Sequence, residues 1–188
     1  MASKDNNLVS LCRPEDSGVS GYPKRHVFGK LDGSQGITDT LKTTSFLHDA
    51  IIEIDELIGG TEDCWDSNNH CDNIKVIAGT IRPTGKYIWT NKGGCKNMTL
   101  KCHNVINSGS EVCVDLGNNS EQGEGQEFTR LDLKTVDGSP ITIRVLRGSK
   151  PELVEGSGPY KYVFPHPDSW YHGICVWILD KLFKAGLI

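Results

Sequence analysis

"CDNIKVIAGTIRPTGKYIWT" at residues 71–90 and "CKNMTLKCHNVINSGSEVCV" at residues 95–114 align without a gap, at an offset of 24 positions (71 to 95). Each copy alternates apolar and polar residues on both sides of a turn that contains glycine, as short β-strands do. Matching positions carry similar residues: Cys71 and Cys95, Ile74 and Met98, Val76 and Leu100, and Ile88 and Val112. A repeat of this length predicts stacked coils that bury their apolar faces against one another, a β-solenoid.

A third, looser copy begins near Phe128, after an insertion that reads as a loop. Its apolar residues again alternate: Leu131, Leu133, Val136, Ile141, Ile143 and Val145. We therefore expect about three coils. If they stack, Ile74 and Met98 lie one layer apart in the core, and so do Ile88 and Val112.

The segment before the repeat, residues 44–58, has a helical pattern. Its apolar residues fall at spacings of three and four: Phe46, Leu47, Ala50, Ile51, Ile54, Leu57 and Ile58. Thr44 or Ser45 can cap the start of a helix, and Gly59 can end it. Because the end of a strand stack must be covered, we predict an N-terminal capping helix over residues 44–58.

The regions on either side of the stack divide the chain further. Residues 1–43 lack an apolar period and predict an extended N-terminal arm; residues 44–148 hold the capping helix and the solenoid; residues 149–188 form a C-terminal extension. In that extension "YKYVF" can form a short strand, and Asp168 or Ser169 can start an amphipathic helix. This helix either closes the second end of the stack or forms an oligomer interface, with Trp170, Ile174, Trp177, Ile178, Leu182 and Phe183 on its apolar side.

The order of a helix, "GG", a polar stretch, "IKVIAGTIRPTGKYIW" and "GGCKNMTLKC" resembles the entry to the right-handed parallel β-helix of pectate-lyase-like proteins, a group that includes phage tailspikes. The resemblance covers residues 44–146 and implies a mainly β fold, a short right-handed parallel β-helix. Enzymes of that group have more coils than the three expected here. No catalytic Asp or Arg cluster of the family matches this chain, so sugar cleavage is not implied.

Charge and cysteine content narrow the class of protein. The net charge is −4, with 20 Lys and Arg interspersed among 24 Asp and Glu, which disfavours nucleic acid and anionic membranes as partners. The N-terminus lacks the apolar stretch of a signal peptide, and no apolar run is long enough to span a membrane, so we expect a cytoplasmic origin. Seven cysteines, an odd number, indicate reduced thiols.

Cysteine and histidine offer one candidate metal site, which we reject. Its members would be Cys64, His70, Cys71, Cys95, Cys102 and His103. Each cysteine pair is separated by six residues (64 to 71, and 95 to 102), whereas zinc ligands come as closer pairs. Since Cys71 and Cys95 occupy matching repeat positions, a cysteine ladder in the core explains them, and we expect no metal and no cofactor.

Two further sets of residues bear on carbohydrate chemistry. Carboxylates that a glycoside hydrolase could use in pairs are Asp63, Asp66, Asp115, Glu127 and Asp132, although solvated surface charge explains them as well. Aromatic residues that could stack on a sugar are Trp65, Tyr87, Trp89 and Tyr171, with His172 beside them. No nucleophile motif or phosphate-binding loop is present, and no catalytic residue is assigned.

These observations favour a non-enzymatic structural or assembly protein. By analogy with tailspikes we expect a component of a phage or virus particle, such as a decoration, cement or tail-associated subunit. We expect it to form a homo-oligomer, a trimer by the same analogy, and to bind other virion proteins through residues 1–43. The alternative is a β-helix protein that binds or cleaves carbohydrate.

Overall fold

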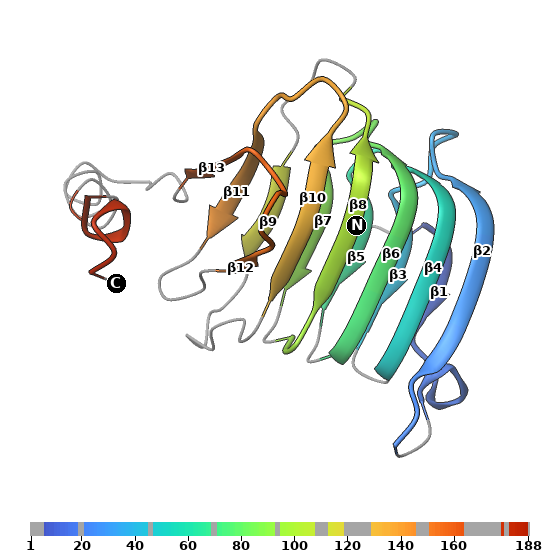
Figure 1. Ribbon diagram of the computed structural model, residues 1–188. Coiled ribbons are helices and arrows are strands. Elements are labelled where there is room, and N and C mark those ends of the chain that lie inside the picture. Colours follow the sequence, from blue (N-terminus) through green and yellow to red (C-terminus); the bar gives the residue numbers. More distant parts are fainter. Residues whose placement is uncertain are drawn as a thin grey trace, which may run out of the picture.

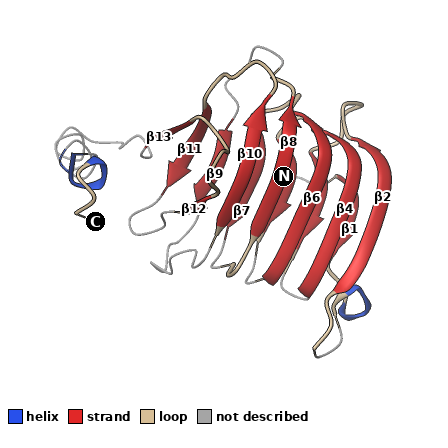
Figure 2. Cartoon of the chain, in the orientation of Figure 1, coloured by secondary structure: helices blue, strands red, loops and turns tan. Residues whose placement is uncertain are grey.

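The computed structural model describes residues 6–18, 21–44, 47–68, 71–92, 95–107, 113–118, 129–145, 151–163, 178 and 181–187. Its strands form two sheets that lie face to face (Figures 1 and 2). In order across the seven-stranded sheet these are β1 (Asn7–Leu11), β3 (Asp39–Thr43), β5 (Asp63–Ser67), β7 (Tyr87–Lys92), β9 (Cys113–Asn118), β11 (Ile141–Val145) and β13 (Tyr160–Val163). Across the six-stranded sheet they are β12 (Glu152–Leu153), β10 (Arg130–Thr135), β8 (Thr99–Val105), β6 (Asp72–Arg82), β4 (His48–Ile58) and β2 (Lys24–Asp32).

Consecutive strands alternate between the two sheets, and every pairing of neighbouring strands is parallel. The chain therefore winds as a coil that places one strand in each sheet per turn, which confirms a mainly β, parallel solenoid-like fold. The stack is longer than the expected three coils. The thirteen strands in the described part of the chain make six coils of two strands, with β13 beginning a seventh.

Strand register agrees with the sequence repeat in the middle of the stack. Val76 pairs with Leu100 and Lys75 with Thr99, which places Ile74 one layer from Met98; both are buried. This prediction is confirmed. The expected partner of Ile88, Val112, lies outside the described residues. Nearby, Trp89 pairs with Val114, so the offset there has grown to 25 (89 to 114) and the repeat is no longer regular.

The predicted capping helix is wrong, because residues 48–58 form strand β4. Ala50, Ile52 and Ile54 point into the core, and Ala50 and Ile52 pair with Ile74 and Val76 at the same offset of 24 (50 to 74). "HDAIIEIDELI" is thus a further copy of the repeat. Leu57 is also buried, three residues after Ile54, and this irregular step in the alternation imitated a helical spacing.

Residues 1–43 do not form the expected extended arm where they are described, since they contribute β1, β2 and β3 to the two sheets. The sequence repeat does not reveal these strands, because the first coil, β1 and β2, departs from the residue pattern of the later coils. Lys24 and His26 of β2 pair with Ala50 and Ile52, so polar residues occupy positions that are apolar in later coils. The short 3-10 helix η1 (Pro14–Asp16) lies between these strands, and its Asp16 carbonyl oxygen is 3.0 Å from His26 Nε2.

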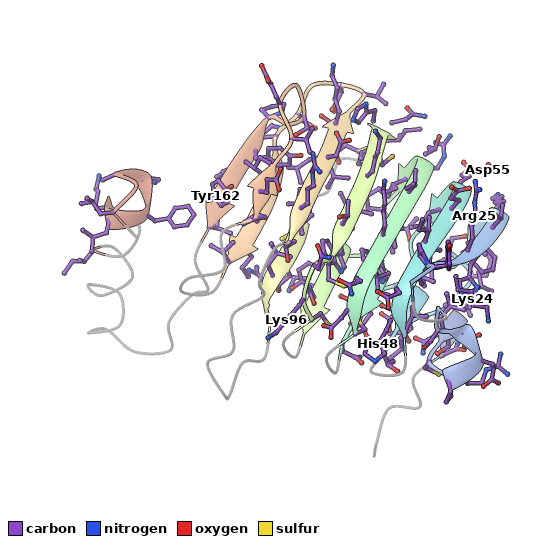
Figure 3. All side chains as sticks on the ribbon, turned by 60° about the horizontal axis from the view of Figure 1, so that its bottom comes forward. Lys24, Arg25, His48, Asp55, Lys96 and Tyr162 are labelled. Carbon is purple, nitrogen blue, oxygen red and sulfur yellow. The ribbon has the colours of Figure 1, made fainter. Side chains whose placement is uncertain are left out.

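The other end of the stack carries aromatic residues. The predicted strand at "YKYVF" is present as β13, and the third repeat copy is present as β10 and β11. Ile178 and residues 181–184 are helical; Phe183 is 8% exposed and packs edge-on against Tyr162, with ring centroids 5.0 Å apart. Figure 3 shows Tyr162 at the end of the stack opposite Lys24 and Arg25. Phe183 therefore belongs to the core of its own chain, which corrects its assignment to an oligomer interface.

Two further residues of that predicted interface are at least partly exposed to solvent. Ile178 is 45% exposed, and Leu182 is partly exposed. Trp170, Ile174 and Trp177 lie outside the described residues. No helix in the described parts of the chain has the length and apolar character needed to span a bilayer.

Candidate functional site

A row of polar residues crosses the seven-stranded sheet on the face turned away from the core. Lys42 pairs with Asp66, Asp66 with Thr90, Thr90 with Asp115, and Asp115 with Arg144. We call these five residues, one from each strand from β3 to β11, the outer row. They alternate along their strands with core residues, so their side chains point to the opposite face of the sheet.

The outer row is arranged as a cation, an anion, a hydroxyl, an anion and a cation. Lys42 Nζ is 3.8 Å from Asp66 Oδ2, and Arg144 Nη1 donates to Asp115 Oδ2 at 3.2 Å. Burial lowers the pKa of Arg144, but the bond to a tyrosine hydroxyl and the charge of Asp115 outweigh it and raise that pKa. The guanidinium therefore stays charged beside Asp115.

A second set of residues extends this polar face. Asp63 pairs with Asp39 on β3 and with Tyr87 on β7. Thr90 Oγ1 donates to Asp63 Oδ1 at 2.7 Å, and Arg144 Nη1 donates to the Tyr87 hydroxyl at 3.0 Å. Three of the five carboxylates that the sequence offered, Asp63, Asp66 and Asp115, thus meet on one face. Asp132 lies on the other sheet, and Glu127 is outside the described residues.

These polar side chains have little contact with solvent. Asp63, Asp66 and Asp115 are 2–3% exposed, and Thr90 is 1% exposed. Burying carboxylates is costly unless hydrogen bonds and opposite charges compensate, and each of the three has such a contact to another coil. What the arrangement does in the folded chain is to bond successive coils to one another.

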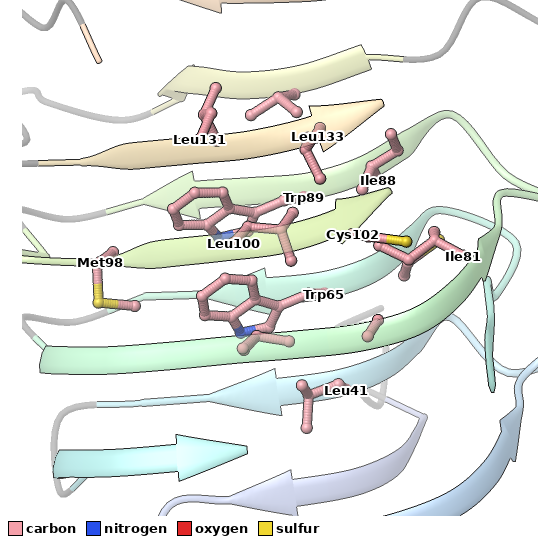
Figure 4. Close-up of a cluster of buried hydrophobic side chains, with 14 of the residues drawn as sticks. Leu41, Trp65, Ile81, Ile88, Trp89, Met98, Leu100, Cys102, Leu131 and Leu133 are labelled. Atoms are coloured by element: carbon pink, nitrogen blue, oxygen red, sulfur yellow. The ribbon is translucent and has the colours of Figure 1, made fainter. Parts of the chain in front are cut away.

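The aromatic residues proposed for sugar stacking are mostly inside the protein. Trp65 and Trp89 are fully buried and stack on each other between the sheets (Figure 4). A sugar ring cannot reach either face, so these two assignments are wrong. Tyr87 is partly exposed, but Lys86 Nζ lies 5.0 Å from its ring centroid and Arg144 binds its hydroxyl. Tyr171 and His172 lie outside the described residues.

Inside the stack, a polar ladder runs beside the tryptophans. Thr43, Ser67 and Asn91 pair in register at the offset of 24 (43 to 67 to 91) and are all buried. Trp65 Nε1 donates to Thr43 Oγ1 at 3.1 Å, and Trp89 Nε1 donates to Ser67 Oγ at 2.8 Å. The ladder therefore satisfies the indole N–H groups that burial would otherwise leave without an acceptor.

The cysteines that we rejected as zinc ligands occupy the core. The Sγ atoms of Cys71 and Cys95 are 3.3 Å apart, and Cys64 and Cys102 are also buried. The predicted cysteine ladder is confirmed. Within the described ranges, no group of three or more His, Cys, Asp and Glu side chains is arranged to hold a metal ion. His70 lies outside those ranges.

A polar cluster on the six-stranded sheet is more exposed. Asp132 on β10 is hydrogen-bonded to His103 Nε2 and lies 3.2 Å from Lys101 Nζ, both on β8. Burial raises the pKa of Asp132, but these two neighbours outweigh it, so the pKa lies below its ordinary value. The sequence offers His103 as a metal ligand, whereas its partner in the structure is Asp132, 29 positions away (103 to 132) and outside the repeat offset.

Sequence reasoning missed Lys42, Thr90 and Arg144 as members of the outer row. A signal was present for two of them, because 42, 66 and 90 are spaced by the offset of 24 that had been found in the repeat. The prediction of an arm over residues 1–43 conflicts with this signal, because Lys42 lies in β3. Arg144 follows Asp115 by 29 positions, so no repeat offset predicts it.

Comparisons of the chain with known protein families, with curated proteins and with solved structures found no match.

Proposed function

We propose that this chain is a non-enzymatic structural or assembly protein, a phage or virus particle component of the decoration, cement or tail-associated kind. The observation that carries the proposal is that buried polar side chains bond neighbouring coils to one another. Asp63, Asp66 and Asp115 are buried and bonded to residues of neighbouring coils, as a stiff scaffold requires. The virion origin and a right-handed winding rest on the resemblance to pectate-lyase-like β-helices.

The first coil is the proposed surface for binding other particle proteins, in place of an extended arm. β1 and β2 are the end strands of their sheets, so each has one edge without a strand partner among the described residues. Leu8, Tyr22 and Val27 of this coil are 42%, 82% and 68% exposed. Strand edges with apolar side chains beside them are surfaces on which another protein can add a strand.

Reconstitution onto particles tests this surface. Particles from the source organism, stripped of the chain, are incubated with the purified protein and separated on a density gradient. We expect the wild type to sediment with the particles and a Tyr22→Ser, Val27→Ser double variant to remain at the top. Val136→Ser is the matched control, because Val136 is 64% exposed but lies beyond β10, far along the stack. Absence of the wild-type chain from particle fractions would refute the proposal.

A homotrimer completes the proposal and is tested separately by native mass spectrometry of the full chain. The proposed contact is the C-terminal segment, where Ile178 is exposed. We expect a trimer that Ile178→Glu converts to monomer. A wild-type monomer at micromolar concentration would reject self-association.

The alternative from the sequence is a β-helix protein that binds or cleaves carbohydrate. Asp66 and Asp115 cannot be its catalytic pair in the folded chain, because they are 3% and 2% exposed and are paired with Lys42 and Arg144 of neighbouring coils. Incubation with acidic and neutral polysaccharides discriminates the two functions. New reducing ends produced by the wild-type chain would establish cleavage and reject the structural proposal.

A further inference from the structure

Two buried thiols face each other across neighbouring coils. Cys71 and Cys95 are 24 positions apart (71 to 95), and their Sγ atoms are 3.3 Å apart in the reduced state. The adjacent residues Asp72 and Lys96 form a parallel bridge, so the cysteines occupy equivalent places on successive turns. Neighbouring strands lie about 4.8 Å apart, within the range of Cα separations that a disulfide bond spans.

The surroundings distinguish this pair from the other buried cysteines. The thiols of Cys71 and Cys95 share a hydrogen bond, and Cys71 Sγ lies 3.7 Å from Thr43 Oγ1; these contacts lower the pKa of Cys71. The pKa of Cys95 is raised, first by the same bond and then by burial. Burial also raises the pKa of Cys64 and Cys102. A thiolate is the reactive form of cysteine, and the shared hydrogen bond stabilises a thiolate on one member of this pair, a contact that the structure does not show for Cys64 or Cys102.

We propose that Cys71 and Cys95 are an oxidation site, at which hydrogen peroxide converts the thiol pair into a disulfide bond between neighbouring coils. The Cys71 thiolate attacks one peroxide oxygen and gives a sulfenic acid and hydroxide, which takes up the proton that Cys71 released and becomes water. The Cys95 thiol then attacks the sulfenic sulfur and releases a second water. Two thiols are oxidised and one peroxide is reduced to two waters.

Burial decides which oxidants act at this site. Both cysteines are 0% exposed, so a large oxidant such as a protein disulfide has no access to them in the folded chain. Peroxide is close to water in size and reaches the pair through small local openings of the structure. The product joins the coil of β5 and β6 to that of β7 and β8. It lowers the entropy of the unfolded chain and so raises the melting temperature.

The test treats the folded, full-length protein with hydrogen peroxide, blocks remaining thiols, and maps disulfides by mass spectrometry without reduction. We expect a loss of two hydrogen atoms, a Cys71–Cys95 peptide, and a melting temperature several degrees higher that returns to its original value with reductant. Cys102→Ala is the control, and it keeps the crosslink because Cys102 is buried elsewhere in the core. Cys95→Ala should lose the crosslink.

Two results would overturn the proposal. One is a disulfide that maps to any other cysteine pair in the folded protein. The other is the absence of a Cys71–Cys95 crosslink in folded protein when the same treatment of unfolded protein produces one. Since both results come from the wild-type chain, they hold even if the Cys95→Ala variant does not fold.

Discussion

Trp65 and Trp89 stack face to face in the core, with ring centroids 4.4 Å apart and ring planes inclined by 6°. They are paired residues of β5 and β7, 24 positions apart (65 to 89), and neither is accessible to solvent. The centroid separation is close to the distance between neighbouring strands, so the stack of rings follows directly from the stack of coils. The stacking of these two large core side chains therefore depends on the register of β5 and β7.

Replacing Trp89 with alanine should remove about 3–5 kcal/mol from the free energy of unfolding, as large aromatic truncations in cores do. Trp89→Phe should reduce the free energy of unfolding by less, because it keeps an aromatic ring against Trp65. Its remaining cost comes from the smaller ring and from the lost hydrogen bond to Ser67. Urea unfolding followed by circular dichroism measures both. Tyr22→Ala is the control, and its loss should be near zero because Tyr22 is 82% exposed. Equal effects of the Trp89 and Tyr22 variants would contradict this account of the core.

Asn73 should be the least replaceable residue of a ladder on the outside of the turns. Asp49, Asn73 and Asn97 all have positive φ, and Asn73 Nδ2 donates to Asp49 Oδ1 while Asn97 Nδ2 donates to Asn73 Oδ1. Asn73→Ala loses both bonds and strains the backbone, at a cost of about 1–3 kcal/mol. Asn73→Gly loses the bonds without the strain, so it should unfold at a higher urea concentration than the alanine variant. The reverse order would show that φ is unimportant here.

Gly85→Ala should destabilise the fold because two successive turns approach closely at this position. An added Cβ would lie 2.6 Å from the Glu62 carbonyl oxygen and 2.7 Å from that of Gly60, and backbone atoms cannot easily move away. We expect a loss of about 1–3 kcal/mol, the usual cost of overpacking. Gly29→Ala is the matched control, since its added Cβ would meet only Asp55 Oδ2, at 4.0 Å. A thermal melt that ranks Gly29→Ala as the worse variant would contradict the close approach.

Arg144→Ala should cost more than the loss of an exposed arginine. It leaves the Asp115 carboxylate, 3% exposed, without its guanidinium partner, and we expect a loss of about 2–4 kcal/mol, since Arg144 itself is 32% exposed. Arg25→Ala breaks the solvent-exposed ion pair with Glu53 and should reduce the free energy of unfolding by less than about 1 kcal/mol. Chemical unfolding of both variants measures the difference. Similar losses would mean that the outer row contributes nothing beyond an ordinary surface pair.

Asp132 should make the stability depend on pH in the acid range. Its pKa is below the ordinary value of 3.8 in the folded protein, so its stabilising contribution is complete above that value and is lost as the pH falls through the lowered pKa. The difference in unfolding free energy between wild type and Asp132→Asn should shrink as the pH falls below 3.8. His103→Gln should weaken this dependence, since His103 helps to lower that pKa. A difference that grows on acidification would reverse the sign of the argument.

Prediction from sequence succeeded where the repeat was regular. Cys71 with Cys95 and Ile74 with Met98 could be matched by eye, because parallel coils place residues of equal phase in one column and the core accepts only similar residues there. It failed at β4, where Ile54 and Leu57 are both buried three residues apart and imitate a helix. Local spacing cannot distinguish an irregular strand from a helix of this length.

The candidate site was predictable only in part. Asp63, Asp66 and Asp115 were named as carboxylates, but their burial and their bonds to Thr90, Lys42 and Arg144 depend on residues up to 29 positions away. Trp65 and Trp89 were assigned to a sugar surface because an aromatic residue looks the same in a sequence whether it faces the core or solvent. Which face a strand residue takes is set by the register of both neighbouring strands.

The sequence alone determined the length of the coil, the parallel stacking and the columns of like residues, because these follow from a period and from the need to bury apolar surface. The tertiary structure alone decided how many coils the described residues form, that residues 6–18 and 21–43 join the stack, and which polar side chains meet. Those outcomes depend on contacts between coils whose sequences no longer resemble one another. In the first coil Lys24 and His26 take apolar positions, so only the pairing of β2 with β4 shows that it belongs to the stack.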